Sequence, residues 1–430
     1  MPKKILIFIL KILAQAALWR YKPLIIGVTG NVGKTSTKEA IYAVLKEKFS
    51  ARRNIKNYNN EIGAPLTILG QVSGGKSWWQ WLKIFLIGFF EIFYTKDYPK
   101  ILILEMGADK IGDISYLTDF IKCHAGVITA IGAIPVHVEF FQSVDQVARE
   151  KSNLIRNLDK SGWAVLNYDD ERVRAMMKKT SAQIFTYGFD EQADLRASNF
   201  EQHLDNLNEA GISFKVDYQG SNVPIRLKDI YARHQVYSIL AGMAIGLIFK
   251  MNLVEIGEAL KNHQSPVGRL HLLRGIKNTW IIDDTYNSSP VACEGALKTL
   301  GEIKCRVEGC RKIAVLGDML ELGKHTIEAH KNIGRLAKEN AEAVIVVGQR
   351  AKNIAEGARE AGMRADSIFE CVDSRGAGEF LKTFVQKNDI VLIKGSQGMR
   401  MERTVEQVML GQDSKEKLLV RQDKEWLDKE

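Results

Sequence analysis

A glycine-rich loop that joins a short apolar segment to a helical one constrains this chain more than any other feature. Residues 24–28 are apolar, residues 29–36 form the loop, and residues 38–49 place apolar side chains at helical spacing. Phosphate-binding loops require this order of strand, loop and helix. In such loops, backbone N–H groups and the positive helix end hold phosphates, Lys34 would neutralise them, and the Thr35 hydroxyl can ligate Mg²⁺. The segment therefore predicts a site for ATP or another nucleotide.

A carboxylate lies at the end of the next buried segment. Residues 101–104 are apolar and run directly into Glu105. Because the carboxyl ends of parallel strands meet at one edge of a sheet, Glu105 is predicted beside the nucleotide, where it can ligate Mg²⁺. Another apolar segment at 127–130 and a helical pattern over 144–158 follow. This alternation predicts an α/β fold with a central phosphate-loop ATPase domain built on a mainly parallel sheet.

The alternating pattern restarts near residue 265. The polar stretch 190–225 before it predicts a small β excursion. Beyond it, strands are predicted at 280–282, 313–316, 343–347 and 390–393, with helices ending near residue 300 and spanning 326–338. These indicate a Rossmann-like C-terminal α/β domain. The predicted divisions are a basic apolar N-terminal helix over 1–22, a central ATP-binding domain over 23–265, and a C-terminal domain over 266–430.

The charge of the chain is concentrated at its beginning. The whole chain carries 60 basic and 51 acidic residues, and residues 1–60 alone hold twelve basic and two acidic ones. A nucleic-acid-binding protein usually spreads its basic residues over a folded face, so no nucleic-acid partner is predicted. The location of the excess favours phosphates or an anionic membrane surface instead.

The five cysteines are scattered and odd in number. Only Cys305 and Cys310 lie close together, and no second pair completes a zinc site. We therefore expect no disulfide framework, and a reducing cytoplasm is the default location.

Two apolar helices are predicted at 1–22 and 78–94. The first carries a narrow polar stripe made of Lys4, Lys11, Gln15 and Lys22. The second has Trp and Tyr at its ends but contains Lys83 and Glu91. Neither segment is long and uncharged enough for a convincing bilayer span. Peripheral membrane contact through residues 1–20 and 78–94, at the inner face of the membrane, and packing on the protein's own core both remain open.

The motifs taken together resemble the Mur ligase family, whose members build the peptide stem of peptidoglycan for cell-wall synthesis. The loop Thr29-Gly-Asn-Val-Gly-Lys-Thr-Ser36 is similar to the family's ATP loop. Further similar segments occur in family order at 57–67, 105–108, 137–141, 268–270, 283–287, 316–323 and 394–402. The last two most resemble the ligases that join D-Ala-D-Ala to a UDP-linked muramoyl tripeptide.

This resemblance implies a reaction and a set of residues. ATP would convert a carboxylate of the muramoyl peptide to an acyl phosphate, which the amine of D-Ala-D-Ala then attacks, in an ADP-forming ligation. Catalytic roles are implied for Lys34, Glu105, His137 and Lys151, the last being carbamylated in the family. Mg²⁺ ligation is implied for Thr35, Glu105, His137 and Lys151. ATP contacts are implied for Thr29, Gly30, Asn31, Gly33, Lys34, Thr35, Ser36, Arg269, Asp284 and Asn287, and acceptor contacts for Asn57, Asn59 and Asn60.

The chain also departs from the family pattern. Two asparagines usual in the family are absent from the segment 234–238, and Asn153 stands where the family usually has Glu. Only 23 residues precede the first strand, where we expect the family's UDP-sugar-binding domain. Two alternatives therefore stay open. One is a related amide ligase with another or a lipid-linked acceptor. The other is a non-catalytic, membrane-associated nucleotide-binding scaffold, although retention of the implied catalytic residues argues against it.

Overall fold

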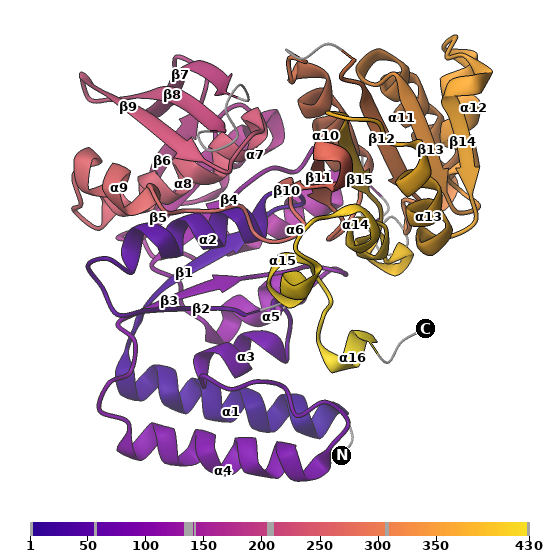
Figure 1. The fold of residues 1–430 in the computed structure, drawn as a ribbon. Helices are drawn as coiled ribbons and strands as arrows, with labels where there is room; N and C mark the ends of the chain where they lie inside the picture. Colours follow the sequence, from indigo (N-terminus) through magenta and orange to yellow (C-terminus); the bar gives the residue numbers. More distant parts are fainter. Residues whose placement is uncertain are drawn as a thin grey trace. The chain divides into compact units, whose positions relative to one another are not determined.

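The computed structural model describes the chain from Lys3 to Leu427, except for residues 56–57, 133–140, 142, 204–209 and 306–308 (Figure 1). The predicted site residues Asn57 and His137 lie outside the described residues. The chain forms two compact units. The first comprises residues 1–199, 214–225 and 235–263, and the second comprises residues 200–213, 226–234 and 264–430.

The first large sheet is mainly parallel, which confirms the predicted fold class. Its order is β2-β3-β1-β4-β5-β6-β7-β8-β9, and the neighbouring strands from β2 to β7 pair in parallel. The strands are β1 (Leu24–Thr29), β2 (Ala51–Arg53), β3 (Ile101–Glu105), β4 (Ala125–Ile128), β5 (Trp163–Asn167), β6 (Gln183–Gly188), β7 (Leu195–His203), β8 (Gly211–Tyr218) and β9 (Ser221–Lys228). All residues of β3 and β4 are buried, which explains why these strands read as continuous apolar runs. Strands β7 to β9 form the predicted β excursion.

The helices of this part of the chain are α1 (Lys3–Tyr21), α2 (Lys34–Leu45), α3 (Gly63–Ile68), α4 (Trp78–Tyr94), α5 (Asp113–Phe120), α6 (Val144–Arg156), α7 (Glu171–Ala175), α8 (Arg233–Ile248) and α9 (Leu253–Leu260). Helix α4 has the predicted bounds. Helix α2 begins four residues before the predicted 38, because the polar residues of its first turn hide its periodicity.

Helix α1 packs on the protein's own core, which was one of the two alternatives left open by the sequence. Its residues Leu6, Leu10, Ala14 and Ala17 are buried, and α1 contacts both α3 and α4. Figure 1 shows α1 and α4 side by side below the first sheet. The predicted polar stripe is interrupted, since Lys11 lies over the rings of Tyr116 and Phe120 at 4.8 and 5.2 Å. Among the described helices, none combines the length and the hydropathy that crossing a bilayer requires.

The second unit contains a six-stranded sheet of order β10-β11-β15-β12-β13-β14. Only the β10–β11 pair is antiparallel, and the other pairs are parallel, as a Rossmann-like domain requires. Its strands are β10 (His271–Arg274), β11 (Trp280–Asp284), β12 (Lys312–Gly317), β13 (Ala343–Val347), β14 (Ile368–Cys371) and β15 (Ile390–Lys394). Its helices are α10 (Pro290–Glu302), α11 (Thr326–Asn340), α12 (Lys352–Glu360), α13 (Ser374–Phe384), α14 (Glu402–Val408), α15 (Lys415–Leu418) and α16 (Lys424–Leu427). Separate apolar clusters include residues of α10 to α12 and of α13 and α14, so helices cover both faces of the sheet.

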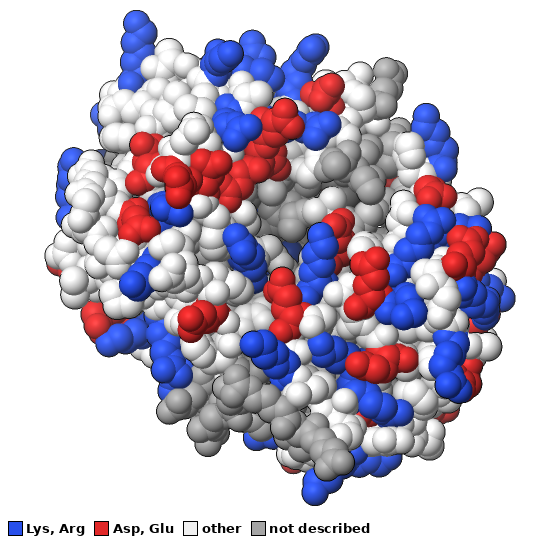
Figure 2. All heavy atoms as spheres, turned by 90° about the horizontal axis from the view of Figure 1, so that it is seen from above, with Lys and Arg blue, Asp and Glu red and all other residues white. Residues whose placement is uncertain are grey.

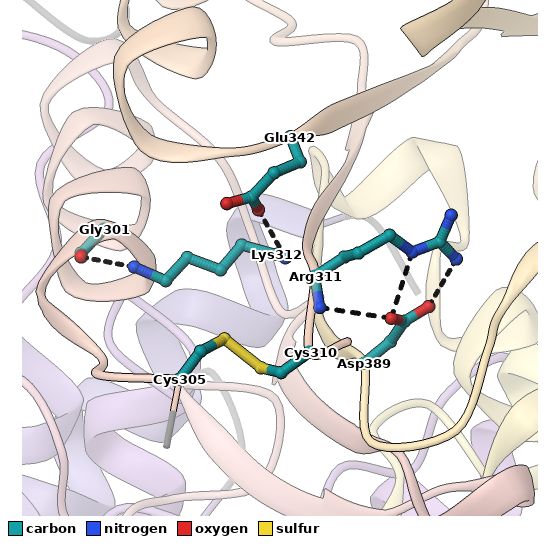
Figure 3. Close-up of a disulfide and its surroundings, with 7 residues drawn as sticks. All are labelled: Gly301, Cys305, Cys310, Arg311, Lys312, Glu342 and Asp389. Carbon is teal, nitrogen blue, oxygen red and sulfur yellow. Dashed lines mark hydrogen bonds and ion pairs between the residues drawn. A yellow bond between two sulfur atoms is a disulfide. The ribbon is translucent and has the colours of Figure 1, made fainter. Parts of the chain in front are cut away.

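One cysteine pair differs from the sequence expectation. Cys305 and Cys310 form a disulfide that closes the segment between α10 and β12 (Figure 3). Their Cα atoms lie 5.7 Å apart, within the usual range for a disulfide. Beside it, Lys312 Nζ donates to the Gly301 carbonyl at 2.6 Å. The other three cysteines are free thiols.

Candidate active site

The glycine-rich loop has the backbone that a phosphate site needs. Gly33 adopts a left-handed conformation with φ of 84° immediately before α2 begins at Lys34. At Gly30, φ is 149° and an added Cβ would lie 1.9 Å from Thr129 Oγ1, so no larger residue fits. Lys34 Nζ donates to the carbonyls of Gly30 at 2.9 Å and Asn31 at 3.3 Å. The lysine therefore lies over the loop, where a phosphate can take over its hydrogen bonds.

Side chains of the loop and of the neighbouring strands hold it in place. Thr29 Oγ1 donates to the Met106 carbonyl at 2.8 Å, and Asn31 Nδ2 donates to the Ile131 carbonyl at 2.6 Å. Thr129 Oγ1 donates to the Val32 carbonyl at 2.6 Å. The Thr29 hydroxyl and the Asn31 side-chain NH₂ thus bind the protein's own carbonyls, as does the Asn31 main-chain N–H, which donates to the Ala130 carbonyl at 2.7 Å. Ser36 lies in the first turn of α2.

Glu105 and Thr35 meet at the end of this loop. In the parallel register of β1 and β3, Glu105 is the partner of Val28, the residue just before the loop motif. Thr35 Oγ1 donates to Glu105 Oε2 at 2.9 Å, and Asn59 Nδ2 donates to Glu105 Oε1 at 3.2 Å. Glu105 is only 5% exposed. A buried carboxylate beside a hydroxyl forms the all-oxygen donor set that Mg²⁺ prefers.

The main chain of Glu105 is held by a residue that the sequence did not single out. Asn54 is 1% exposed, and its Oδ1 accepts from the Glu105 N–H at 2.6 Å. Lys38 Nζ, itself buried, donates to the Asn54 carbonyl at 2.8 Å. Asn54 stands three residues before the motif at 57–67, and only the three-dimensional contact identifies it as a support of Glu105.

Lys151, on α6, is buried close to this site. It is 3% exposed, and burial lowers the pKa of its amine to about 7, with the nearby Lys34 cation lowering it further. The carboxylates of Asp109, Glu150 and Glu105 act in the opposite direction. At neutral pH a substantial fraction of Lys151 is therefore an uncharged, nucleophilic amine.

Asn153, where the chain departs from the family pattern, ties α6 to its neighbour. Its Nδ2 donates to Ser115 Oγ on α5 at 2.9 Å and to Glu150 Oε2 at 3.3 Å. Glu150 Oε1 in turn accepts from the Ile114 N–H at 2.8 Å. This network fixes the position of α6 and so the position of Lys151.

The two described members of the predicted acceptor set differ in their contacts. Asn59 contacts Glu105, as described, whereas Asn60 Oδ1 accepts from the N–H groups of Ile62 at 3.2 Å and Gly63 at 3.0 Å. Asn60 therefore shapes the turn before α3. Within the described ranges, no group of three or more His, Cys, Asp and Glu side chains gathers to hold a metal ion. A phosphate-loop site needs only one or two protein ligands, because substrate phosphates supply others.

Two of the predicted nucleotide residues of the second unit, Asp284 and Asn287, contact Lys394. Lys394 Nζ donates to Asp284 Oδ2 at 2.6 Å and to the Asn287 carbonyl at 3.0 Å. Asp284 Oδ1 also accepts from the Leu270 N–H at 3.2 Å. The Arg269 guanidinium lies 4.1 Å from the centre of the Tyr286 ring. Lys394 is the first residue of the family-like segment 394–402, but the sequence alone did not indicate what this lysine does.

His234 lies near the same polar residues, although its side chain is exposed. The surrounding protein lowers the pKa of its imidazole, with Asp284 opposing this shift and Lys394 adding to it. His234 is therefore neutral at physiological pH. It opens the segment in which two asparagines usual in the family are replaced.

Comparison with known proteins identifies two domains. The Mur ligase middle domain matches residues 87–246, and the Mur ligase glutamate ligase domain matches residues 268–397. Three relatives are named UDP-N-acetylmuramoyl-tripeptide–D-alanyl-D-alanine ligase. The Mycobacterium tuberculosis protein is 33% identical over 73% of this chain, the Mycobacterium leprae protein 30% over 86%, and the Bacillus subtilis protein 28% over 92%. The matches cover 56%, 71% and 78% of these relatives, so the chain spans little more than half the length of the first.

Solved structures share the fold. MurF from Acinetobacter baumannii matches with a TM-score of 0.75 and 24% identity, over 92% of this chain and 79% of its own. MurF from Thermotoga maritima in complex with ADP matches with a TM-score of 0.75 and 24% identity, over 93% and 83%. At this identity, these two structures establish the architecture of the chain.

Proposed function

Since the chain belongs to the Mur ligase family, we propose that it is an ATP-dependent, ADP-forming amide ligase of peptidoglycan precursor synthesis. Its substrates would be D-Ala-D-Ala and UDP-N-acetylmuramoyl-tripeptide, the pair in the names of its relatives. The observation that carries the proposal is the gathering of Lys34, Thr35, Glu105 and buried Lys151 around one phosphate loop. We place the reaction in the cytoplasm, where ATP is available.

Ligation would occur in two steps at this loop. A carboxylate oxygen of the tripeptide attacks the γ-phosphorus of ATP, and the bond to the β-phosphate oxygen breaks, giving an acyl phosphate and ADP. The amine of D-Ala-D-Ala then attacks the acyl carbon, loses a proton, and expels inorganic phosphate. Lys34 would leave the Gly30 and Asn31 carbonyls for the β- and γ-phosphates, where its charge stabilises the transferring group.

The residues present fit Mg²⁺. Thr35 and Glu105 would hold one ion, since their oxygens lie 2.9 Å apart at the loop. When bound, Mg²⁺ neutralises phosphate charge and so lowers the barrier to phosphoryl transfer. Asn59 would hold the Glu105 carboxylate and Asn54 its main chain, through the hydrogen bonds described above.

Lys151 is proposed to act as a carbamate. Its neutral amine would attack CO₂ and lose a proton, which converts a buried cation into an anionic oxygen ligand. The lowered pKa of Lys151 supports this step because only the unprotonated amine is nucleophilic. Together with His137, the carbamate would hold a second Mg²⁺.

The remaining assignments concern the nucleotide and the acceptor. Arg269, Asp284 and Asn287 are proposed to contact the nucleotide, with Lys394 orienting Asp284 through their 2.6 Å contact. Asn57 and Asn59 are proposed to contact the acceptor, while Asn60 supports their loop.

A lipid-linked acceptor is the second candidate. It is favoured by one observation, the large number of exposed apolar side chains on α1 and α4. Such a surface would keep the enzyme where lipid-linked substrates lie.

A phosphate-release assay tests the function. Purified full-length protein is supplied with ATP, Mg²⁺, D-Ala-D-Ala and either UDP-N-acetylmuramoyl-tripeptide, with lysine or diaminopimelate as third residue, or a lipid-linked muramoyl tripeptide. We expect phosphate release that needs both D-Ala-D-Ala and the UDP-linked acceptor, with the amide product seen by mass spectrometry. Release with the lipid-linked acceptor alone would select the second candidate. ATP binding without any amide product would refute both ligase assignments.

A further inference from the structure

Exposed apolar side chains are concentrated on two neighbouring helices. Of the twenty large apolar side chains exposed in the described part of the chain, twelve lie on α1 and α4, helices of 19 and 17 residues. Among them, Trp19 is 77% exposed, Trp79 66% and Phe8 63%. Single exposed apolar residues need no explanation, but a cluster of this size marks an interaction surface.

Each helix has one face on the protein and another in solvent. On α4, Trp81, Ile84, Gly88 and Ile92 are buried, whereas Leu82, Leu86, Phe89 and Phe93 recur at spacings of three and four on the exposed side. On α1, Ile5, Phe8, Ile12 and Trp19 recur at spacings of three, four and seven, opposite the buried Leu6, Leu10, Ala14 and Ala17. The exposed stripes are therefore regular features of folded helices whose other faces are already packed.

The two helices form one layer within the first unit. Gly88 of α4 faces α1, since an added Cβ there would lie in van der Waals contact with a Leu13 methyl group, at 3.7 Å. At the other end, Tyr21 OH donates to carbonyls of α4 and the residue after it, including Ile92 at 3.1 Å and Thr95 at 3.1 Å. The layer is visible at the bottom of Figure 1. The exposed side chains of both helices therefore project from a packed pair of helices. We call these exposed apolar side chains of α1 and α4 the apolar layer.

The charge around the apolar layer is positive. Residues 1–22 contain five basic and no acidic residues, and residues 76–100 contain four basic and two acidic ones. Lys4, Lys22 and Lys83 are exposed. By contrast, basic and acidic side chains are interspersed on the face shown in Figure 2. A cation-rich margin attracts anionic lipid headgroups.

We propose that the apolar layer docks the protein on the surface of an anionic lipid bilayer, with α1 and α4 lying in the headgroup region. Trp and Tyr are the side chains that favour this interface, and the layer has Trp19, Trp78, Trp79 and Tyr94 at the ends of its helices. Lysines can reach the headgroups while apolar side chains enter the acyl boundary.

The charge around the apolar layer favours an anionic lipid bilayer over a second copy of the chain as its partner. A symmetric dimer through the same face would bring two sets of basic residues together, and the cores of protein interfaces are depleted in charge. A bilayer with anionic lipids satisfies both the apolar side chains and the cations. This inference does not depend on the proposed ligase activity.

Vesicle binding by the full-length protein tests the inference. Binding is measured by co-sedimentation with phosphatidylcholine vesicles with and without phosphatidylglycerol, and insertion by quenching of tryptophan fluorescence with brominated lipids. We expect binding that needs phosphatidylglycerol and weakens as salt is added. We also expect bromine quenching of the exposed tryptophans. Failure of the intact protein to bind anionic vesicles would overturn the inference.

Two triple variants locate the surface. Substitution of Trp79, Phe90 and Phe93 by serine (W79S/F90S/F93S) should weaken vesicle binding about tenfold or more, since each change removes a large exposed apolar group from the layer. The matched control, V254S/I327S/V372S, changes three equally exposed apolar residues elsewhere and should bind as the parent does. Circular dichroism and binding of a fluorescent ATP analogue check that both variants fold.

Equal loss of binding in the two variants would overturn the assignment of the surface to α1 and α4. Sedimentation velocity without lipid provides a further test. A dimer that W79S/F90S/F93S dissociates, with no vesicle binding by the parent, would show that a second copy covers the layer and refute a lipid partner.

Discussion

Removing one partner of the buried ion pair of Lys394 and Asp284 should strongly destabilise the second unit. The two side chains are 2% and 12% exposed, and their charged atoms lie 2.6 Å apart. Replacing Lys394 by methionine keeps most of the side-chain volume but leaves the Asp284 carboxylate with only the Leu270 N–H as a described donor. Removing one partner of a buried pair costs about 3–5 kcal/mol, because an uncompensated charge stays in a medium of low polarity.

The magnitude can be converted to a measurable shift. With a urea dependence of about 2.5 kcal/mol per molar for a unit of this size, a loss of about 4 kcal/mol lowers the unfolding midpoint by about 1.6 M. Asp284→Asn should cause a loss of the same order, since it leaves the buried Lys394 cation without its carboxylate. The double variant K394M/D284N removes both charges, so it should cost clearly less than the sum of the two single changes.

The assay is urea unfolding of the full-length variants, followed by circular dichroism and by hydrogen exchange in peptides from β11 and β15. The matched control is the exposed pair Arg364–Asp366, whose side chains are 79% and 60% exposed. Its double variant R364M/D366N should leave the midpoint unchanged, because solvent screens the pair. Single-variant losses below about 1 kcal/mol that simply add in K394M/D284N would refute the reasoning, since they would mean that the two charges do not couple.

Four further changes test the first unit. Lys34→Ala should abolish phosphate release in the ligase assay while the fold measured by circular dichroism is retained. Lys151→Ala should lose most activity, and added acetate or another short carboxylate should restore part of it by replacing the carbamate; no rescue at any concentration, with a folded protein, would speak against that role. Asn59→Ala should raise the Mg²⁺ concentration needed for half-maximal activity by about tenfold to a hundredfold, because Glu105 loses a hydrogen bond that positions it. His263 is buried, and burial together with the nearby Lys46 cation lowers the pKa of its imidazole to about 4. As pH falls from 6.5 to 4, the unfolded chain therefore takes up this proton before the folded chain does, so up to about 3 kcal/mol of stability is lost. His263→Leu should flatten the pH dependence of the unfolding midpoint in that range.

Much of the local structure could be predicted because it depends on neighbours in the sequence. The apolar run before the glycine loop predicts β1, and helix α4 begins and ends where its apolar pattern does. Glu105 was placed at the end of a buried strand by the same reasoning, and it is the last residue of β3. Periodicity and turn chemistry act over a few residues, so a single sequence contains them.

The predicted ends of helices and strands were wrong where polar residues contribute to the candidate active site. Helix α2 begins at Lys34, although apolar periodicity starts only after residue 38. Strand β4 ends at Ile128, two residues before the predicted end, because Thr129 binds the glycine loop instead of continuing the strand. At both places the chain supplies groups to the loop, and such functional positions break the local pattern.

Only the tertiary structure decided which distant residues meet. Asn59 and Glu105 are 46 positions apart in the sequence, yet their side chains form a hydrogen bond. Lys394, on β15, binds Asp284 on the neighbouring strand β11. The same holds for Lys11, whose polar position on α1 is covered by the rings of Tyr116 and Phe120. These contacts depend on strand order, register and helix packing. Those features minimise the free energy of the whole chain, so no local window of sequence contains them.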